Sequence, residues 1–592
     1  MSSSSADSGR KSSGFSRGLS RCLRMLEVPV GERETLNVLR NPDLQPIPAK
    51  DQTWNWASNM AYWGIISFSV GTWISANAAL SVGLSYAETI GTFIIGDVVT
   101  IFFTLANSYH GTDWKVGYTI SQRFVFGIYG SGLGILVRFL MSIVNYGSNA
   151  WLGGLCVNMI LDSWSHHYLT LPNTLTDKVA MSTKEVIGFM IFHVITAFFY
   201  LMKPKSMNYF LIASCCATCI AMTCMIIYLC KVNGGVGSYF KDLETTVTGS
   251  ERSWAWVYMI SYWFGSVSPG STNQSDYSRF ATSKTAVYVG TTLALLIPTT
   301  LIPVYGVIGA STSQELYGSA LWMPMDICDY WLNNGYTAGA RAATFFCGLA
   351  FLCSQISYTI SNCGFAAGMD LSGVLPKYVN IFRGAIFCAM LSVAVQPWNF
   401  YNKSASTFLT VMYSFGVVMT PLISVMICDN FLIRKRNYSV SQAFVVHGEY
   451  YYTWGVNWRA ILAFVCGMAP GLPGLAAEAN PAIMETINPG IVNFYLADSF
   501  TSFLISFFTY WILCLIFPVK INVKQDDKDY YGAFTDEEAR KRNMVPFSEL
   551  LPDEINEYNY NEEAVSPPSY NSPSPSVADV VESENEKSGE HK

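Results

Sequence analysis

Apolar stretches, most of them about 20 residues long, recur twelve times along the chain and constrain its fold more than any other feature. A helix of that length crosses the roughly 30 Å hydrocarbon core of a bilayer. Only 13% of the 592 residues are charged, against about 25% in soluble domains. The sequence therefore predicts an all-α integral membrane protein with about twelve transmembrane helices. The predicted spans are residues 56–79, 86–107, 131–160, 185–202, 207–230, 254–270, 285–310, 339–364, 384–397, 405–429, 459–478 and 499–519.

Polar segments divide the chain into three parts. Residues 1–51 form a Ser-rich, basic tail without a cleavable signal, residues 52–521 hold the spans, and residues 522–592 are rich in charge. An even number of spans places both tails on one side. If that side is the cytoplasm, it receives 28 of the 36 Lys and Arg residues, as the concentration of basic residues in cytoplasmic loops requires. We therefore expect a cytoplasmic N-terminal tail, a transmembrane domain and a cytoplasmic, largely disordered C-terminal tail.

Composition and motifs argue against other classes of function. The formal net charge is −6 and no basic stripe interleaves with aromatic residues, so a nucleic-acid partner is not expected. Cys216 and Cys219 have a C-x-x-C spacing, but no histidine or second pair lies near them in the sequence, so small apolar filler is the favoured interpretation. The spans contain no paired carboxylates, nucleophile motif or metal-spaced cluster. We therefore do not expect a membrane enzyme, and we predict no catalytic residues, no metal site and no cofactor.

Two spans that lie five spans apart share an unusual pattern. Span 1 contains AYWGIISFSVG at 61–71 and span 6 contains SYWFGSVSPG at 261–270, so both are aromatic and both are interrupted by Gly, Ser or Pro. A repeated unit of five helices enters the membrane from the opposite face, so such a repeat would be inverted. Inverted repeats with two matching broken helices are typical of transporters, whose substrate site lies at the breaks. The alternative is that Tyr-Trp pairs are common in membrane spans and that Gly assists helix packing.

Several motifs between about residues 40 and 520 carry a family resemblance. They are NPDLQP at 41–46, QRFVFG at 122–127, NYGSNAW at 145–151, NQSDYSRF at 273–280 and LPKYVNI at 375–381. With these motifs the chain resembles the fungal nucleobase–cation symporters, and DDKDYYGAF at 526–534 is similar to their subgroup of thiamine permeases and nicotinamide riboside transporters. The resemblance implies a five-plus-five inverted repeat with broken helices 1 and 6, plus two extra helices. It also implies inward uptake driven by a cation, in fungi the proton.

The resemblance implies a substrate site as well. In the family, an aromatic residue of helix 3 and a tryptophan of helix 6 enclose a flat ring, while amides of helices 3 and 8 bond its edge. Trp263 stands at the tryptophan position and can stack on a flat heterocycle, a cationic one in particular. Asn145 stands at the position of the helix 3 aromatic, which departs from the two-sided arrangement. The alternatives are an interfacial anchor for the tryptophan and bonds between helices for the amides. The predicted substrate-binding residues are Trp263, Tyr262, Asn145, Asn149, Asn362, Ser67, Ser69 and Gly265, and the predicted cation-binding residues are Ser357 and Thr359.

Two charged residues fall inside predicted spans, where charge is costly and is usually paired or functional. Asp97 in span 2 and Arg138 in span 3 both lie roughly 10–15 Å from the cytoplasmic ends of their spans, at 1.5 Å per residue. A structural Asp97–Arg138 ion pair is the favoured interpretation. Proton coupling, or attraction of a cationic substrate by Asp97, is the alternative.

These patterns together predict a secondary active transporter that imports thiamine, or a related vitamin or nucleoside, across the plasma membrane. Proton symport with alternating access is the expected mechanism. A nicotinamide riboside, nucleobase or nucleoside permease is an alternative, and a nutrient receptor without transport is an alternative of another class. In the C-terminal tail, Pro567, Pro568 and Tyr570 form a Pro-Pro-x-Tyr motif, which predicts docking of a WW-domain ubiquitin ligase unless the segment is only a linker.

Overall fold

The computed structural model describes residues 27–28, 39–176, 180–202, 204–238, 245–402, 405–519 and 525–551. In these residues the regular structure is helical, with isolated β-bridges and no β-strand. All twelve predicted spans are helical. By length and composition alone, seven helices of the described residues can cross a membrane, and one bent helix pair would make an eighth. The predicted all-α membrane fold is therefore confirmed.

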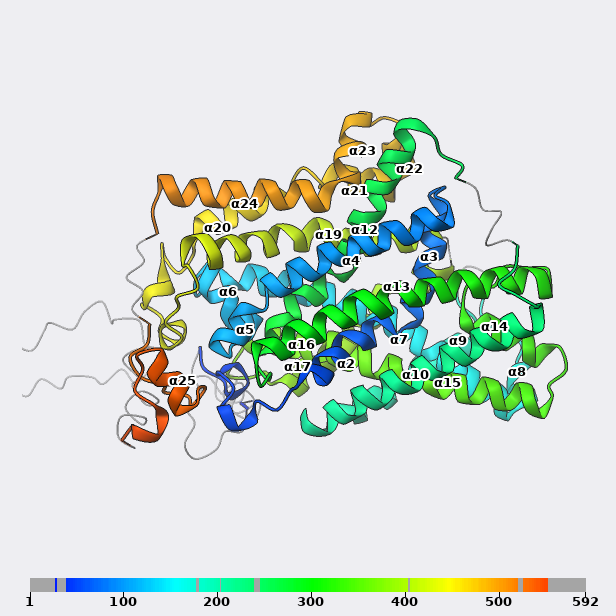
Figure 1. The fold of residues 1–592 in the computed structure, drawn as a ribbon, viewed down its shortest axis with the longest axis horizontal. Helices are drawn as coiled ribbons and strands as arrows, with labels where there is room; N and C mark the ends of the chain where they lie inside the picture. Colours follow the sequence, from blue (N-terminus) through cyan, green and yellow to red (C-terminus); the bar gives the residue numbers. More distant parts are fainter. Residues whose placement is uncertain are drawn as a thin grey trace, which may run out of the picture.

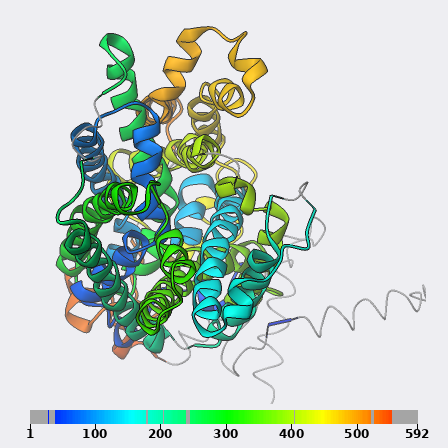
Figure 2. The same ribbon diagram turned by 90° about the vertical axis from the view of Figure 1, so that its right-hand side faces the viewer.

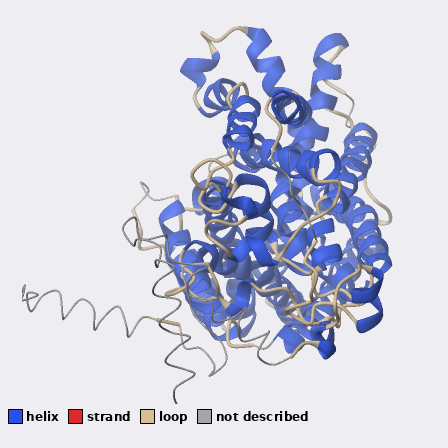
Figure 3. Ribbon diagram, turned by 90° about the vertical axis from the view of Figure 1, so that its left-hand side faces the viewer, coloured by secondary structure: helices blue, strands red, loops and turns tan. Residues whose placement is uncertain are grey.

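The long helices run side by side along the horizontal axis of Figure 1. Figure 2 looks along them from the end that carries α8 and α14, and Figure 3 looks from the opposite end. The twelve segments are α2 (Trp56–Ser67) with α3 (Val70–Ser81), α4 (Tyr86–Ala106), α7 (Ser131–Trp164), α9 (Thr183–Phe199), α10 (Pro204–Asn233), α12 (Gly249–Ser278), α13 (Lys284–Tyr317), α15 (Ala338–Tyr358) with the π-helix η3 (Thr359–Gly364) and α16 (Phe365–Val374), α17 (Ile381–Ser392), α19 (Ala405–Cys428), α20 (Trp458–Met468) with α21 (Leu472–Ala479), and α24 (Asp498–Ile516). Shorter helices connect or cap them: α5 (Tyr109–Trp114), α6 (Tyr118–Phe126), α8 (His166–Leu169), α14 (Pro324–Asn333), α18 (Trp398–Asn402), α22 (Pro481–Met484), α23 (Pro489–Leu496) and α25 (Asp536–Lys541).

The predicted break in helix 1 is present, between α2 and α3. Carbonyl groups at the break lose their partners in the helix, and side chains replace those partners. The Thr72 hydroxyl donates to the Ile66 carbonyl at 3.0 Å, and the Ser354 hydroxyl of α15 donates to the Phe68 carbonyl. The break is therefore stable within the bundle because hydroxyl donors compensate the freed carbonyls.

The predicted break in helix 6 is wrong, because α12 continues without interruption to Ser278. Pro269 lacks an N–H group and cannot donate to the carbonyl of Gly265 four residues earlier. The Ser268 hydroxyl donates to that carbonyl instead, at 2.7 Å. The helix therefore passes through the proline with its acceptor satisfied.

Glycines allow the central helices to approach closely. A Cβ atom at Gly290 of α13 would lie 2.4 Å from the Trp56 carbonyl oxygen of α2, and one at Gly306 would lie 2.1 Å from the Trp73 carbonyl oxygen of α3. In a membrane, where lipid chains are as apolar as leucine, such close contacts drive helix association. Helix α13 is therefore pressed against both halves of the broken helix 1.

The first part of the predicted C-terminal tail is folded against one end of the bundle. The Ala533 carbonyl accepts a hydrogen bond from the Gln52 amide at 2.8 Å. The Arg542 guanidinium lies 4.9 Å from the Trp114 ring centre of α5 and 4.6 Å from that of Phe534. Residues 525–551 thus contact both the segment before α2 and the connection between α4 and α7, whereas residues 552–592 lie outside the described part of the chain.

Candidate functional site

A cavity of about 80 Å³ lies at the break of helix 1, near the midpoints of α7 and α12. A smaller one of about 20 Å³ shares five of its lining residues and extends to Asn273 and Asn362. Ligand pockets usually measure about 300–1,000 Å³. Both cavities are therefore smaller in this structure than a typical ligand pocket. The larger cavity is lined by Ile66, Ser69, Gly71, Thr72, Ser75, Asn145, Ser148, Asn149, Leu152, Tyr262, Trp263, Ser266, Val267, Leu295, Thr299, Tyr358, Tyr401 and Met412.

The indole of Trp263 forms one wall of the cavity and is fixed by helix α4. Its Nε1–H donates to Asp97 Oδ1 at 2.7 Å. The Phe93 ring stacks on it at 4.2 Å, with an angle of 27° between the planes. A Cβ atom at Gly96 would lie only 2.7 Å from the indole Cδ1. Phe93, Gly96 and Asp97 have helical spacing, so a single face of α4 holds the indole in one orientation.

Side-chain amides on two helices reach the cavities. The Asn149 amide of α7 donates to the Asn145 carbonyl and to its side-chain oxygen, both at 2.9 Å. The Asn362 amide in η3 donates to Ser361 Oγ at 3.1 Å, while its oxygen is buried without a hydrogen-bond partner in the described residues. An unpaired buried acceptor is costly and calls for a partner. A donor group on the edge of a substrate ring would provide one.

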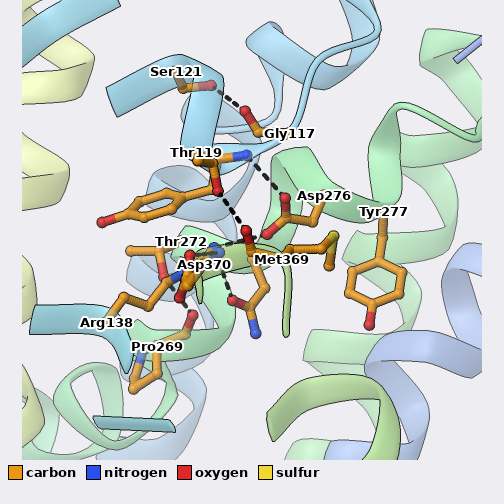
Figure 4. A network of polar contacts seen from close by, with 12 residues as sticks. Gly117, Thr119, Ser121, Arg138, Pro269, Thr272, Asp276, Tyr277, Met369 and Asp370 are labelled. Carbon is orange, nitrogen blue, oxygen red and sulfur yellow. Dashed lines mark hydrogen bonds and ion pairs between the residues drawn. The ribbon is translucent and has the colours of Figure 1, made fainter. Parts of the chain in front are cut away.

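An ion cluster centred on Arg138 lies beyond the cavities, toward the end of the bundle that carries α5. Arg138 Nη1 lies 2.7 Å from Asp276 Oδ2, and Arg138 Nε donates to Asp370 Oδ2 at 2.8 Å. Its guanidinium lies 3.7 Å from the ring centre of Tyr118. Figure 4 shows the side chains of Arg138, Asp276 and Asp370 gathered together, with dashed lines marking the bonds among the residues drawn. The cluster joins α6, α7, α12 and α16 in the buried interior.

The predicted Asp97–Arg138 pair is therefore wrong. Arg138 lies on the side of α7 that faces α16 and the C-terminal end of α12. Asp97 instead faces Trp263 and Thr300. Equal depth along two helices does not place their side chains on facing sides.

Two hydrogen bonds separate the small central cavity from a wider one. The Asn273 amide donates to the Asn362 carbonyl at 3.0 Å, and the Tyr277 hydroxyl donates to the Ser361 carbonyl. Beyond them lies a cavity of about 330 Å³, lined by Asp276 and Tyr277 among others. A partition between α12 and η3 thus closes the central site on this side.

Comparisons with known proteins identify the family and the fold. A model of a family described as permeases for cytosine/purines, uracil, thiamine and allantoin matches residues 46–497. The chain belongs to this family, the nucleobase–cation symporters. A thiamine transporter of Saccharomyces cerevisiae is 69% identical and Nicotinamide riboside transporter 1 of the same yeast is 66% identical, each over 93% of this chain and 91% of the relative. The fold is that of a nucleobase–cation-symport-1 family transporter solved in a closed conformation, with a TM-score of 0.63 at 17% identity over 82% of this chain and 98% of the other.

Membership of the nucleobase–cation symporters settles the general class. The protein is a multi-pass membrane permease, and it is not an enzyme. Its transport of a small molecule is coupled to a cation.

Most of the predicted substrate-binding residues come together, and two do not. Trp263, Tyr262, Asn145, Asn149 and Ser69 line the larger cavity, and Asn362 lines the smaller one. The other two serve helix packing. The Ser67 hydroxyl lies 3.3 Å from the Trp63 carbonyl and 3.5 Å from the Ala294 carbonyl, and a Cβ atom at Gly265 would lie 3.3 Å from Gly416.

The predicted cation-binding residues are both buried and differ in their hydrogen bonds. Ser357 donates to Ser214 of α10 at 2.9 Å, and the Thr359 hydroxyl has no hydrogen-bond partner in the described residues. The hydroxyl that contacts the break of helix 1 is that of Ser354. The cation site remains a prediction.

Several lining residues were missed by the sequence interpretation. Tyr358 precedes Asn362 by four residues, and its hydroxyl lies 3.5 Å from the Asn145 amide, so helical spacing could have identified it. Tyr401 bonds to Ser148 at 2.5 Å but belongs to the short helix α18, which lies between two predicted spans. Nothing in the local sequence pointed to it.

Proposed function

We propose that the protein imports thiamine, or a closely related vitamin or nucleoside, across the plasma membrane by alternating access, with both termini in the cytoplasm. The observation that carries the proposal is the immobilised indole of Trp263 at a cavity beside the break of helix 1, to which side-chain amides and hydroxyls contribute. Thiamine and nicotinamide riboside each contain a flat ring with a positive charge, which is the chemistry that an indole face favours. The yeast relatives named for these two compounds support the same choice.

Uptake of radiolabelled thiamine by cells that lack their own carriers tests the proposal. Saturable accumulation is expected, with unlabelled nicotinamide riboside or nucleobases as competitors that identify the preferred ring. Binding to the cell surface without accumulation would instead support a nutrient receptor. Absence of both would overturn the proposal.

We further propose that the coupled cation is the proton. With the neighbouring Arg279 guanidinium and Asp43 carboxylate, the Arg138 cluster holds three carboxylates against two guanidinium groups, so a proton can balance its charge. For one proton per substrate, each pH unit of gradient that a protonophore removes should lower the accumulation ratio about tenfold, because one pH unit is worth about 1.4 kcal/mol. The measurement is steady-state uptake with and without protonophore, with sodium replaced by choline as the control. Accumulation that depended on sodium and was unaffected by the protonophore would show that sodium, and not the proton, is the coupled cation.

The Pro-Pro-x-Tyr motif lies outside the described residues, and its role stays a proposal. Proline stiffens such a segment toward polyproline II, so less entropy is lost when it docks on a WW domain. Tyr570→Ala is expected to slow substrate-induced removal from the plasma membrane and to reduce tail ubiquitination, without changing the initial uptake rate. Surface biotinylation over time measures removal, with Tyr560→Ala in the same tail as a control. Removal at the wild-type rate would leave the motif without a role.

A further inference from the structure

The carboxylate of Asp97 lies directly behind the wall of the central cavity. Its Oδ1 accepts the Trp263 N–H at 2.7 Å, and Thr300 Oγ1 lies 2.9 Å from its Oδ2. The side chain is 1% exposed, and no ion pair of the described residues includes it. A negative charge at this position would therefore face neutral donors only, in the part of the protein where an uncompensated charge is most costly.

The indole connects this carboxylate to the cavity. Trp263 lines the cavity, while its N–H group points to Asp97. Hydrogen bonding to a carboxylate polarises the donor, and in a medium of low dielectric constant the effect is larger than in water. It makes the ring more negative, which strengthens its attraction for a cation.

We propose that Asp97 is the counter-charge that selects substrates with a cationic heteroaromatic ring, and that it acts through the indole of Trp263. The inference rests on the proposed function, because it concerns the ring that the same cavity accepts. A cation against the indole compensates the buried carboxylate across the ring. An uncharged flat ring stacks equally well but gains nothing from Asp97. The carboxylate thus sets the preference for charge, while the cavity sets the preference for shape.

The surroundings of Asp97 allow its charge to be removed with little change in structure. The Thr300 hydroxyl also lies 2.9 Å from the Leu296 carbonyl, so it can donate there and accept from a neutral group at position 97. In Asp97→Asn, the side-chain oxygen can still accept the Trp263 N–H, and the amide can donate to Thr300. Thr100→Val is the matched control, because it removes a buried hydroxyl of the same helix, which donates to the Gly96 carbonyl, and keeps Asp97, Trp263 and Thr300 unchanged.

Thiamine uptake and its inhibition by thiochrome, a flat and uncharged thiamine derivative, test the inference. Asp97→Asn should raise the KM for thiamine about tenfold or more, equivalent to about 1.4 kcal/mol, with little change in the inhibition constant of thiochrome. Thr100→Val should behave like the wild type. Equal weakening of both compounds by Asp97→Asn, or weakening of neither, would overturn the inference, whereas absence of thiamine uptake by the wild type would overturn the proposed function.

A second comparison does not depend on thiochrome. Trp263→Phe keeps a ring but removes the N–H group that connects it to Asp97. If the two residues act as one unit, the double variant Asp97→Asn/Trp263→Phe should have a thiamine KM no higher than the worse single variant. Multiplication of the two single effects would mean independent roles and would contradict the inference.

Discussion

Trp263→Ala is expected to abolish saturable thiamine uptake while the protein still reaches the cell surface. The change removes the ring on which the substrate is proposed to stack, and cation–π attraction in a dehydrated site is worth about 2 kcal/mol or more, roughly 30-fold in affinity. The space released opens into an existing cavity. Uptake measured against thiamine concentration, together with surface biotinylation, gives both quantities.

Tyr258→Phe provides a matched control for that experiment. Tyr258 lies five residues earlier on α12, is buried, and is absent from the lining of the central cavity. It should leave the KM for thiamine unchanged. A normal KM in Trp263→Ala would exclude the indole as a wall of the substrate site.

Arg138→Ala should prevent stable folding. The variant would leave Asp276 and Asp370 buried without their shared cation, and breaking a buried ion pair on one side typically costs about 3–5 kcal/mol. We expect little protein at the surface and a strongly lowered melting temperature in detergent. Arg138→Lys should be intermediate, because an ammonium group cannot reproduce the forked contacts to two carboxylates.

Removing the opposing charges tests the cause. If unpaired carboxylates are responsible, the triple variant Arg138→Ala/Asp276→Asn/Asp370→Asn should recover part of the lost stability. Equal instability of the single and triple variants would assign the effect to lost packing, for example against the Tyr118 ring. Thermal unfolding of the solubilised protein separates the two explanations.

The sequence predicted the helices well because hydropathy reports contact with lipid. It failed where polar residues are buried among other helices. Residues 271–278 are polar, so the sixth span was ended at residue 270, yet Asn273 and Asp276 are buried in the continuing helix α12. The same reasoning ended the eighth span before Asp370. The predicted spans therefore exclude Asp276 and Asp370, the two partners of Arg138.

The prediction of the substrate site rests on motifs rather than on hydropathy. It can place residues along a helix, but it cannot show how neighbouring helices are rotated against each other. Asn145 and Asn149, which lie four residues apart on α7, both line the cavity. The contacts of Asp97 could not be predicted, because they depend on how α4 is rotated against α12 and α13. The charge of the C-terminal tail predicts disorder, but residues 525–551 are folded in the structure. Their stability comes from contacts with the end of the helix bundle, which the local sequence does not reveal.

The π-helix η3 sets how far α16 is rotated about the helix axis relative to α15. A π-turn holds one residue more than an α-turn, and one residue corresponds to about 100° around an α-helix. Upstream of η3, Tyr358 lies at the cavity, and downstream Asp370 lies at Arg138. Deleting one residue from the segment 359–364 would turn Asp370 away from Arg138, although the side chains of both partners would be unchanged. The number of residues in this segment, and not only their identity, therefore determines whether Tyr358 can line the central cavity while Asp370 pairs with Arg138.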